Sequence, residues 1–560
     1  MKSYIVYLVV LLSILLSKDK KELEFNNNEN YEDYIKLFES SFNKLKVNFV
    51  DSVNESEMIK SGIKGMMKNL DPYTKLLEDN SLESFDILRK GKYGGVGIQI
   101  GLRRDTLTVL APMEDSPAYS EGIIAGDKIM KIDSTFTKGL NVSDASKIIK
   151  GEVGSTVVLG IYRPSTKEKI DFELKRSSIV VKHVPYWGVD KNNIGYIRIT
   201  RFSRNASKDF KKGLEGLQKQ NIKGLVIDLR GNSGGLLSNA INILDYLCER
   251  GELLLFSKGK TNRSNKEWKS RRKPILDIDT PIVVLVNKGS ASASEIVAGT
   301  LQDLDRAVII GQSTFGKGLV QHMYDLNDTI TLKITTSKYY LPSGRLIQKQ
   351  DYLDNGFLTD GLDKIDSLFT TKGGREVKGG NGIVPDIKTK KNILSPYIQE
   401  LWRQGVFLSF AASYVPFNKD LTVPVVIDSK IMKDFKLFIN DYQLEYKLKG
   451  EQEYLNFVDK MKQSPISINR FSKNIYFKES VNKSFITKDS NMNYFDEIKK
   501  VQFLLEENQK WIKNGLEREL SKVIAGEKER IKASLNEDNE YKKAVSLILS
   551  LKEYYTILEF

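Results

Sequence analysis

A stretch near the middle of the chain, residues 281–321, holds a serine-rich turn and a lysine set between two glycines. The apolar run 282–286 is followed by Asn-Lys-Gly and then SASASE, after which apolar residues recur at helical spacing. This pattern predicts a strand that delivers a small-residue turn to a helix N-terminus. A second apolar run, 307–310, leads into a glycine-rich turn that contains Lys317.

A serine at a helix start and a lysine in a turn suggest a hydrolase that uses them as nucleophile and base. The serine hydroxyl needs a proton acceptor, and a neutral lysine can serve as one. Lysine ordinarily titrates near ~10.4, so burial has to lower its pKa by several units. The helix start adds a backbone N–H and a partial positive charge for an oxyanion. The pattern therefore indicates a Ser–Lys hydrolase.

The motifs SASASE and TFGKGLVQ resemble those of the C-terminal processing (tail-specific) peptidases. In that family the nucleophile is the serine 25 residues before the lysine, which selects Ser292 as the partner of Lys317. The resemblance also implies that Gln321 orients the lysine. It implies no metal and no nucleotide cofactor.

A second element, residues 228–235, carries the expected oxyanion site. Its sequence, DLRGNSGG, resembles the D-L-R-x-N-x-G-G segment of the same family. The resemblance implies that one oxyanion donor is the backbone N–H of Gly235. The other is the N–H of Ala293, directly after the serine.

Two other interpretations of the serine and lysine motifs are open. Ser292 and Glu295 form a literal capping box, which explains a serine at a helix start without catalysis. Residues 311–318 approach the phosphate-binding pattern G-x-x-x-x-G-K-[ST], but Gly318 stands where that pattern needs a hydroxyl for magnesium. Residues 319–340 also predict strands rather than the helix of a nucleotide site. The two motifs together favour the peptidase.

A third interpretation comes from residues 231–235, GNSGG, a literal G-x-S-x-G between a predicted strand and a predicted helix. A Ser-His-Asp esterase would use Ser233 and a histidine later in the chain. The chain has two histidines, His183 and His322, and only the second follows that serine. On a strand, its side chain faces opposite to that of Gln321. Both histidines are therefore predicted to be structural.

Residues 89–176 resemble a PDZ domain, with KYGGVGIQI, SPA, AGD and IMKID in the expected order. PDZ domains bind an extended peptide at a sheet edge and hold its terminal carboxylate with backbone N–H groups. Gly95, Val96 and Gly97 are the expected carboxylate loop, with a tight turn as the alternative, and Ile98 begins an apolar wall. The expected ligands are proteins or peptides with free C-termini.

Composition bounds the remaining possibilities. The 560 residues, 40% hydrophobic and 28% charged, are enough for three or four domains. The net charge of +14 comes from scattered Lys and Arg, so nucleic-acid binding is unsupported. Cys248 is the single cysteine and lies in an apolar helical pattern, so it predicts a core residue and no disulfide within the chain.

The first residues, 1–17, hold one lysine followed by an apolar run. This run is too short for an ordinary membrane span and has the length of a signal h-region. It predicts export, to the periplasm or the outer face of the cytoplasmic membrane. A cleaved signal peptide and a retained anchor that tethers the protein to the membrane are the alternatives.

The other ranges complete a multidomain α/β chain. Residues 25–88 predict a small helical region with an LDPY-type stop, similar to that of the family. Residues 177–394 alternate apolar strands with helices, which is typical of an α/β core with a largely parallel sheet. Residues 395–560 predict a helical C-terminal extension, and the apolar end, 556–560, is of the kind that a PDZ groove accepts.

These features together predict an exported serine endopeptidase that recognises protein C-terminal tails and cleaves with a Ser–Lys dyad. The alternative without catalysis is a PDZ adaptor that keeps a protease-like core. A homo-oligomer and an activating adaptor protein are further partners that the sequence leaves open.

Overall fold

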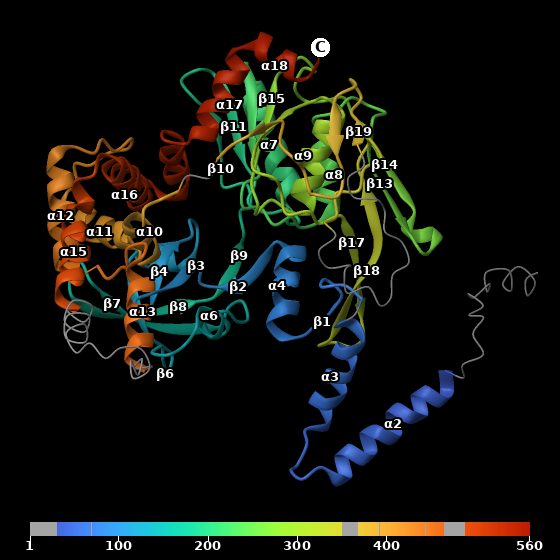
Figure 1. Ribbon diagram of the computed structural model, residues 1–560, viewed down its shortest axis with the longest axis horizontal. Helices are drawn as coiled ribbons and strands as arrows, with labels where there is room; N and C mark the ends of the chain where they lie inside the picture. Colours follow the sequence, from blue (N-terminus) through green and yellow to red (C-terminus); the bar gives the residue numbers. More distant parts are fainter. Residues whose placement is uncertain are drawn as a thin grey trace, which may run out of the picture. The chain divides into compact units, whose positions relative to one another are not determined.

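The computed structural model divides into two compact units, Met1–Leu70 and Asp71–Phe560 (Figure 1). It describes residues 31–68, 70–349, 368–390, 393–442, 444–463 and 488–559. None of the helices in these ranges is long and apolar enough to cross a membrane. The predicted signal segment, 1–17, lies outside the described residues.

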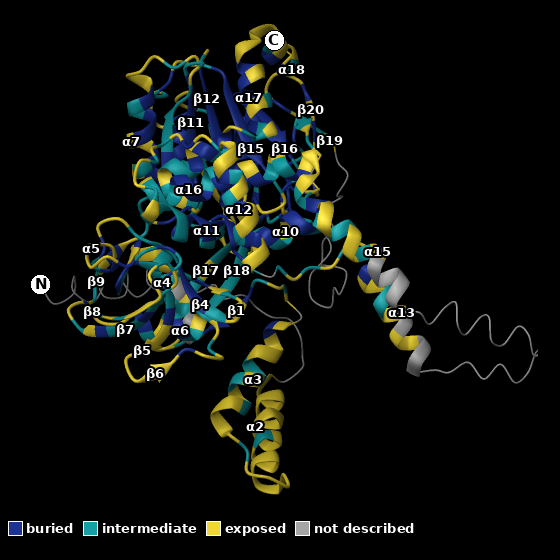
Figure 2. Ribbon diagram, turned by 90° about the vertical axis from the view of Figure 1, so that its left-hand side faces the viewer, coloured by how far each residue is buried: buried dark blue, intermediate teal, exposed yellow. Residues whose placement is uncertain are grey.

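The first unit contains two helices, α2 (Tyr31–Asn48) and α3 (Glu55–Lys68), as the helical pattern predicts. Helix α2 buries no residue and α3 buries only Met67. Figure 2 accordingly shows this pair almost entirely in the colour of exposed residues.

The PDZ domain is an antiparallel sheet with the order β3-β4-β5-β7-β8, and β6 is added beside β5. Because β3 pairs only with β4, it forms one edge of this sheet. Strand β2 instead pairs with β9, which leads into the next domain. The elements are β2 (Lys92–Gly95), β3 (Ile98–Arg103), β4 (Thr106–Pro112), α5 (Pro117–Ser120), β5 (Lys128–Ile132), β6 (Thr135–Phe136), α6 (Val142–Ile149), β7 (Thr156–Arg163), β8 (Glu168–Lys175) and β9 (Ser177–Val180).

The peptidase core contains a sheet with the order β10-β11-β12-β15-β16-β21, parallel except for β10, as the alternating pattern predicts. Its central strands are fully buried, because helices cover both faces (Figure 2). The carboxyl ends of β12, β15 and β16 lead into the segments that hold the predicted oxyanion glycines, serine and lysine. The strands are β10 (Tyr186–Val189), β11 (Ile194–Arg198), β12 (Gly224–Asp228), β15 (Ile282–Val286), β16 (Val308–Gly311) and β21 (Ile387–Lys388).

Alternate residues of these strands face two separate hydrophobic clusters. One cluster is formed with α7 (Ala206–Gln218), α8 (Leu237–Asp245) and α9 (Ala293–Asp303), and it includes Cys248, as predicted. The other is formed with α17 (Asn539–Leu549) and α18 (Leu551–Ile557).

The C-terminal helices α17 and α18 therefore complete the core rather than extend it. The Tyr554 hydroxyl donates to the carbonyl of Ile282 and accepts from its N–H, both at 3.0 Å. Leu558 is buried in the same cluster. The range predicted for the core, 177–394, does not include these two helices. Leu558 is packed in the cluster on the sheet, which does not fit a free tail for a PDZ groove, and Phe560 lies outside the described residues.

A second sheet lies beside the core, with the order β1-β18-β13-β14 and with β17 also paired to β18. Strand β1 lies within the range predicted to be helical, and its three residues pair with β18. The range 25–88 thus contains one short strand besides its helices. The strands of this sheet are β1 (Lys75–Leu77), β13 (Leu253–Gly259), β14 (Lys266–Lys269), β17 (Leu319–Asp325) and β18 (Thr331–Tyr340). Strands β19 (Leu368–Thr370) and β20 (Glu376–Lys378) form a separate two-stranded sheet, and the helices of these segments are α4 (Asp79–Lys90) and η1 (Asn262–Ser264).

Four of the remaining α-helices, α10 (Pro396–Arg403), α11 (Val406–Tyr414), α12 (Ser429–Tyr442) and α16 (Glu506–Leu535), form a third cluster, as the helix-spaced apolar residues predict. Three phenylalanines pack together in this cluster. The ring centroid of Phe435 lies 5.3 Å from that of Phe407 and 5.1 Å from that of Phe410. The other elements of these segments are η2 (Val415–Phe417), α13 (Glu451–Gln463), α15 (Lys488–Val501) and η3 (Gln502–Leu504).

Candidate active site

Ser292 occupies a strained turn between β15 and α9. Its backbone angles are φ 54° and ψ −112°, in a region that residues with a side chain rarely adopt. Glycine at position 234 lets the neighbouring loop approach, because a Cβ there would lie 2.9 Å from the Cβ of Ser292. A helix cap does not need such strain, whereas a nucleophile presented at a strand-to-helix turn does.

Glu295, in the first turn of α9, accepts hydrogen bonds from both the serine motif and the lysine motif. Its buried carboxylate accepts from the backbone N–H of Ser292 at 2.8 Å and from that of Lys317 at 2.9 Å, both through Oε2. Its Oε1 accepts from the N–H of Gly316 at 2.6 Å and from the Thr314 hydroxyl at 2.5 Å. Burial raises the pKa of Glu295, while these hydrogen bonds oppose the rise. The predicted cap residue is therefore a clamp between the two motifs.

Tyr339 of β18 joins the same two residues through their carbonyl groups. Its hydroxyl lies 3.3 Å from the carbonyl oxygen of Ser292 and also bonds to that of Lys317. The side chain is almost fully buried. Sequence patterns mark Tyr339 only as a strand residue, so its role is visible only in the folded chain. The backbones of Ser292 and Lys317 are thus held together by one carboxylate and one phenol.

Lys317 is half-buried, and its amine faces an aromatic ring. The Nζ atom lies 4.3 Å from the centroid of the Tyr73 ring. Burial, followed by the repulsion of Lys333, lowers the pKa of Lys317 to about 8, against the attraction of Asp71 and Glu295. About a tenth of the lysine is therefore neutral at pH 7, and a general base has to be in this neutral form to accept a proton.

Gln321 does not contact the lysine among the described residues, contrary to the expectation. Its Nε2 lies 3.4 Å from the hydroxyl oxygen of Thr335. That hydroxyl in turn donates to Oδ1 of Asp71 at 3.2 Å. A register shift between Val320 and Gln321 interrupts the β17–β18 pairing at this point. Gln321 is thus connected to the turn that carries Tyr73 rather than to Lys317 itself.

The two expected oxyanion donors flank the serine. In the described part of the chain, neither the N–H of Gly235 nor that of Ala293 has a hydrogen-bond acceptor. The N–H of Gly234, by contrast, donates to the side chain of Asn232 at 2.9 Å. The carbonyl of Asn232 accepts from the Ser294 hydroxyl at 2.8 Å. Asn232 therefore ties the glycine loop to the turn that holds the nucleophile.

The predicted carboxylate loop precedes the edge strand of the PDZ domain. The N–H groups of Val96 and Gly97 have no acceptor within the ranges that the structure describes, while their carbonyls accept from Ala118 and Met113. The Val96 side chain is fully buried, so this residue offers only its backbone. Gly95 instead ends the β2–β9 pairing, opposite Ser177.

The apolar wall of the PDZ domain follows that loop. Ile98 and Ile100 of β3 are half-buried and pack against the domain core together with Val142 and Ile148 of α6. The groove between an edge strand and a helix is the place where an extended peptide adds to a sheet.

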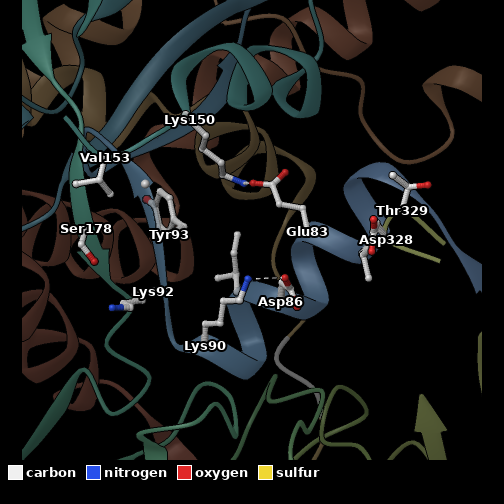
Figure 3. Close-up of a pocket in the computed structure, with 14 residues that line it drawn as sticks. Glu83, Asp86, Lys90, Lys92, Tyr93, Lys150, Val153, Ser178, Asp328 and Thr329 are labelled. Atoms are coloured by element: carbon white, nitrogen blue, oxygen red, sulfur yellow. Dashed lines mark hydrogen bonds and ion pairs between the residues drawn. The ribbon is translucent and has the colours of Figure 1, made fainter. Parts of the chain in front are cut away.

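A cavity of about 850 Å³ lies beside the same loop, between α4 and the PDZ domain (Figure 3). The Lys150 side chain points toward Glu83 of α4, with 3.0 Å between Nζ and the carboxylate. Lys90 bonds to Asp86 of the same helix at 2.7 Å. Neither Ser292 nor Lys317 lines this cavity, so it is separate from the dyad.

Comparison with known proteins identifies the family of the chain. The carboxy-terminal-processing protease of Bartonella bacilliformis is 34% identical over 343 residues, which cover 60% of this chain and 78% of that protein. The chain belongs to peptidase family S41. The model of that family matches residues 193–356, and a PDZ domain model matches residues 94–174.

Other S41 relatives extend the comparison. The carboxy-terminal processing protease CtpA of Bacillus subtilis is 33% identical over 311 residues, 55% of this chain and 66% of that protein. A solved photosystem II D1 C-terminal processing protease is 28% identical, covers 64% of this chain and 88% of its own, and has a TM-score of 0.36. The protein is thus a C-terminal processing serine protease with a PDZ domain.

The G-x-S-x-G motif of this S41 peptidase lacks the surroundings of an esterase site. Ser233 is exposed and has no positive φ, unlike Ser292. His322 is exposed on β17 and bonds to the Thr336 hydroxyl at 2.6 Å. Burial lowers the pKa of His183 to about 4, with a contribution from Arg201. In the described residues neither histidine bonds to Ser233, as the structural interpretation predicts.

The DLRGN segment of the peptidase is anchored by a buried ion cluster. Asp228 is fully buried and accepts from Tyr196 at 2.7 Å, from Arg198 at 2.8 Å and from Arg230 at 2.7 Å. The two arginines hold the pKa of this carboxyl well below its usual range, against the effect of burial. Arg230 also bonds to Asp538 at 2.6 Å, at the start of α17. The C-terminal helices are thereby tied to the oxyanion loop, a link that sequence patterns did not indicate.

Proposed function

We propose that this peptidase hydrolyses peptide bonds with Ser292 as nucleophile and Lys317 as its base. The observation that carries the proposal is the double clamp, in which Glu295 binds both N–H groups and Tyr339 binds both carbonyls of the pair. The strain at the serine and the lowered pKa of the lysine support the same assignment.

The reaction follows from these groups. The proton of the Ser292 hydroxyl moves to the neutral Nζ of Lys317 while Oγ bonds to the scissile carbonyl carbon. The oxyanion that forms accepts from the N–H groups of Gly235 and Ala293, which have no other acceptor in the described part of the chain. The lysine ammonium then gives its proton to the departing amine. Water, activated by the same lysine, releases the acyl group.

Gln321 contributes to this mechanism as a positioning residue. Its amide is linked through Thr335 to Asp71, and Asp71 shapes the turn on which Tyr73 lies over the lysine. Gln321→Ala should therefore lower turnover less than loss of either dyad residue, because it removes orientation rather than a reacting group.

Fluorophosphonate labelling tests the dyad and separates it from a PDZ adaptor without catalysis. The wild-type protein should become labelled at one serine and lose peptidase activity. Ser292→Ala should abolish labelling, and Lys317→Ala should slow it strongly. Labelling of wild-type and Ser292→Ala protein to the same extent would contradict the assignment.

We also propose that the PDZ domain recognises the C-terminal tails of protein substrates. The free N–H groups of Val96 and Gly97 at the start of an edge strand support carboxylate binding, and the wall from Ile98 favours small or apolar last residues. Peptides that differ only in a free or an amidated C-terminus provide the test. The acid should bind more tightly by roughly 1 kcal/mol or more, because a charge-assisted hydrogen bond is lost in the amide.

We further propose that the protein is exported, on the strength of the apolar run in residues 1–17. Expression of the full chain, followed by fractionation and N-terminal sequencing, tests this. A shortened protein in the exported fraction indicates cleavage, and a full-length protein in the membrane fraction indicates a retained tether. Recovery of the full-length chain only from the cytosol would contradict export.

A further inference from the structure

The turn that connects the first unit to the second lies against the catalytic lysine. The Asp71 carboxylate accepts from the N–H groups of Tyr73 at 2.7 Å and Thr74 at 2.9 Å. The hydroxyl of Thr74 then accepts from the N–H of Thr335 at 3.1 Å. Strand β1 follows directly and pairs with β18. The turn is therefore fixed to the sheet that carries Tyr339, although more than 200 residues separate them in sequence.

Tyr73 is the group that this turn places at the amine. Its ring centroid lies 4.3 Å from Nζ of Lys317, within the range of a cation–π contact. Among the described residues, Nζ has no hydrogen bond and no carboxylate within ion-pair distance, so its contact with charge-stabilising geometry is the one with this ring. The charged groups that face the lysine more remotely are Lys333 on β18, Lys75 on β1, Asp71 in the turn and Glu295 on α9.

We propose that Tyr73 is a positioning residue for the general base, whose ring face stabilises the ammonium that forms on Lys317 when Ser292 loses its proton. The inference rests on the proposed dyad and deepens it. The proton leaves the serine oxygen as that oxygen bonds to the carbonyl carbon, and it converts the amine to an ammonium. A neutral amine gains little from a ring face, whereas a cation is attracted by the ring quadrupole. The contact therefore favours the transition state over the reactive form of the resting enzyme, in which the amine is neutral.

Three substitutions at this position have different expected effects on the same full-length enzyme. Tyr73→Phe keeps the ring face, so kcat should stay within about threefold of wild type. Tyr73→Leu keeps an apolar cover without a ring face, so kcat should fall by roughly twofold to thirtyfold, with little change in KM. Tyr73→Ala opens the site to water and should lower activity at neutral pH further.

The pH profile of kcat/KM distinguishes this role from simple space filling. Its acid limb reports the pKa of the free base. In Tyr73→Leu the limb should move to lower pH, because the protonated amine loses its partner while burial remains. In Tyr73→Ala the limb should move to higher pH, because water now solvates the ammonium. Tyr73→Phe should keep the wild-type limb, as should Tyr324→Leu, a change at an exposed tyrosine on β17.

Circular dichroism and thermal unfolding show which variants fold. If Tyr73→Ala does not fold, the comparison of Tyr73→Phe with Tyr73→Leu is enough to test the inference. The inference is overturned if Tyr73→Phe and Tyr73→Leu both keep the wild-type acid limb and kcat. It is also overturned if kcat falls as much in Tyr73→Phe as in Tyr73→Leu. Ser292→Ala is assayed beside them. If it retains activity, both the dyad and this inference are contradicted. If Ser292→Ala is inactive and the Tyr73 variants keep the wild-type acid limb, only this inference is overturned.

Discussion

The proposed dyad and the proposed peptide groove of the PDZ domain differ in how their backbone groups are bound. Around Ser292 and Lys317, a carboxylate and a phenol bind the N–H and carbonyl groups of both residues, and the serine is held in a strained conformation. At the PDZ loop, the N–H groups of Val96 and Gly97 have no acceptor among the described residues, and they lie beside a strand that forms the edge of its sheet. A reacting pair needs fixed geometry, whereas recognition of varied tails needs unoccupied donors.

The largest expected effect comes from removing the dyad. Ser292→Ala and Lys317→Ala should each lower kcat by a factor on the order of 10⁴ or more, and the double variant should be little worse, because both act in one step. Lys317→Arg should be equally inactive, since arginine cannot give up its proton near neutral pH. Peptide hydrolysis by purified variants measures these effects.

The matched control for the dyad is Ser233→Ala, which changes the exposed serine of the oxyanion loop. It should keep most of the turnover, because this loop contributes a backbone N–H. Loss of activity in Ser233→Ala together with an active Ser292→Ala would favour the esterase and would remove the contrast between the two regions.

The pH dependence should be the next largest effect. Burial lowers the pKa of Lys317 to about 8, and the lysine acts only when it is neutral. The value of kcat/KM should therefore fall about tenfold for each pH unit below that pKa and level off above it. The affinity of the inactive Ser292→Ala variant for tail peptides should not fall with pH in this way. A flat rate profile between pH 6 and 9 would contradict a lysine base.

Breaking the clamp should have an intermediate effect. Tyr339→Phe keeps the buried ring and removes the hydroxyl that bonds to the carbonyls of Ser292 and Lys317. The two carbonyls lose a donor, so kcat should fall by roughly fivefold to a hundredfold, equivalent to about 1–3 kcal/mol. Tyr324→Phe is the control, at an exposed position. Equal kcat values for both variants would mean that the clamp does not position the dyad.

The smallest effect on chemistry should come from the PDZ loop. Gly97 has φ 75°, and a Cβ there would lie 2.2 Å from that of Ser116, so Gly97→Ala must displace the loop. KM for tail peptides should rise by about tenfold, while kcat for a short ester substrate stays unchanged. Gly139→Ala is the matched control, because this glycine has φ 85° but open space around it. If Gly97→Ala lowers ester turnover as well, the two regions are coupled.

Much of this architecture could be predicted from local patterns. The strand-turn-helix around Ser292, the glycine-flanked Lys317 and the PDZ motifs each lie within a short stretch, where periodicity and turn chemistry act. The helical segments at both ends follow from apolar residues at helical spacing. These features established the fold class, and they nominated the serine, the lysine and the carboxylate loop.

Contacts between distant parts of the chain were decided only by the tertiary structure. Glu295 was recognised as a cap, but its bonds to Lys317 exist only because β15 and β16 are neighbours in the sheet. Tyr73 was recognised as part of a helix stop, yet the pairing of β1 with β18 carries its ring to the lysine. Gln321 was assigned to the lysine, and a register shift directs it to Thr335 instead. Local sequence encodes backbone preference, whereas the partner of a buried polar group depends on which segments pack together.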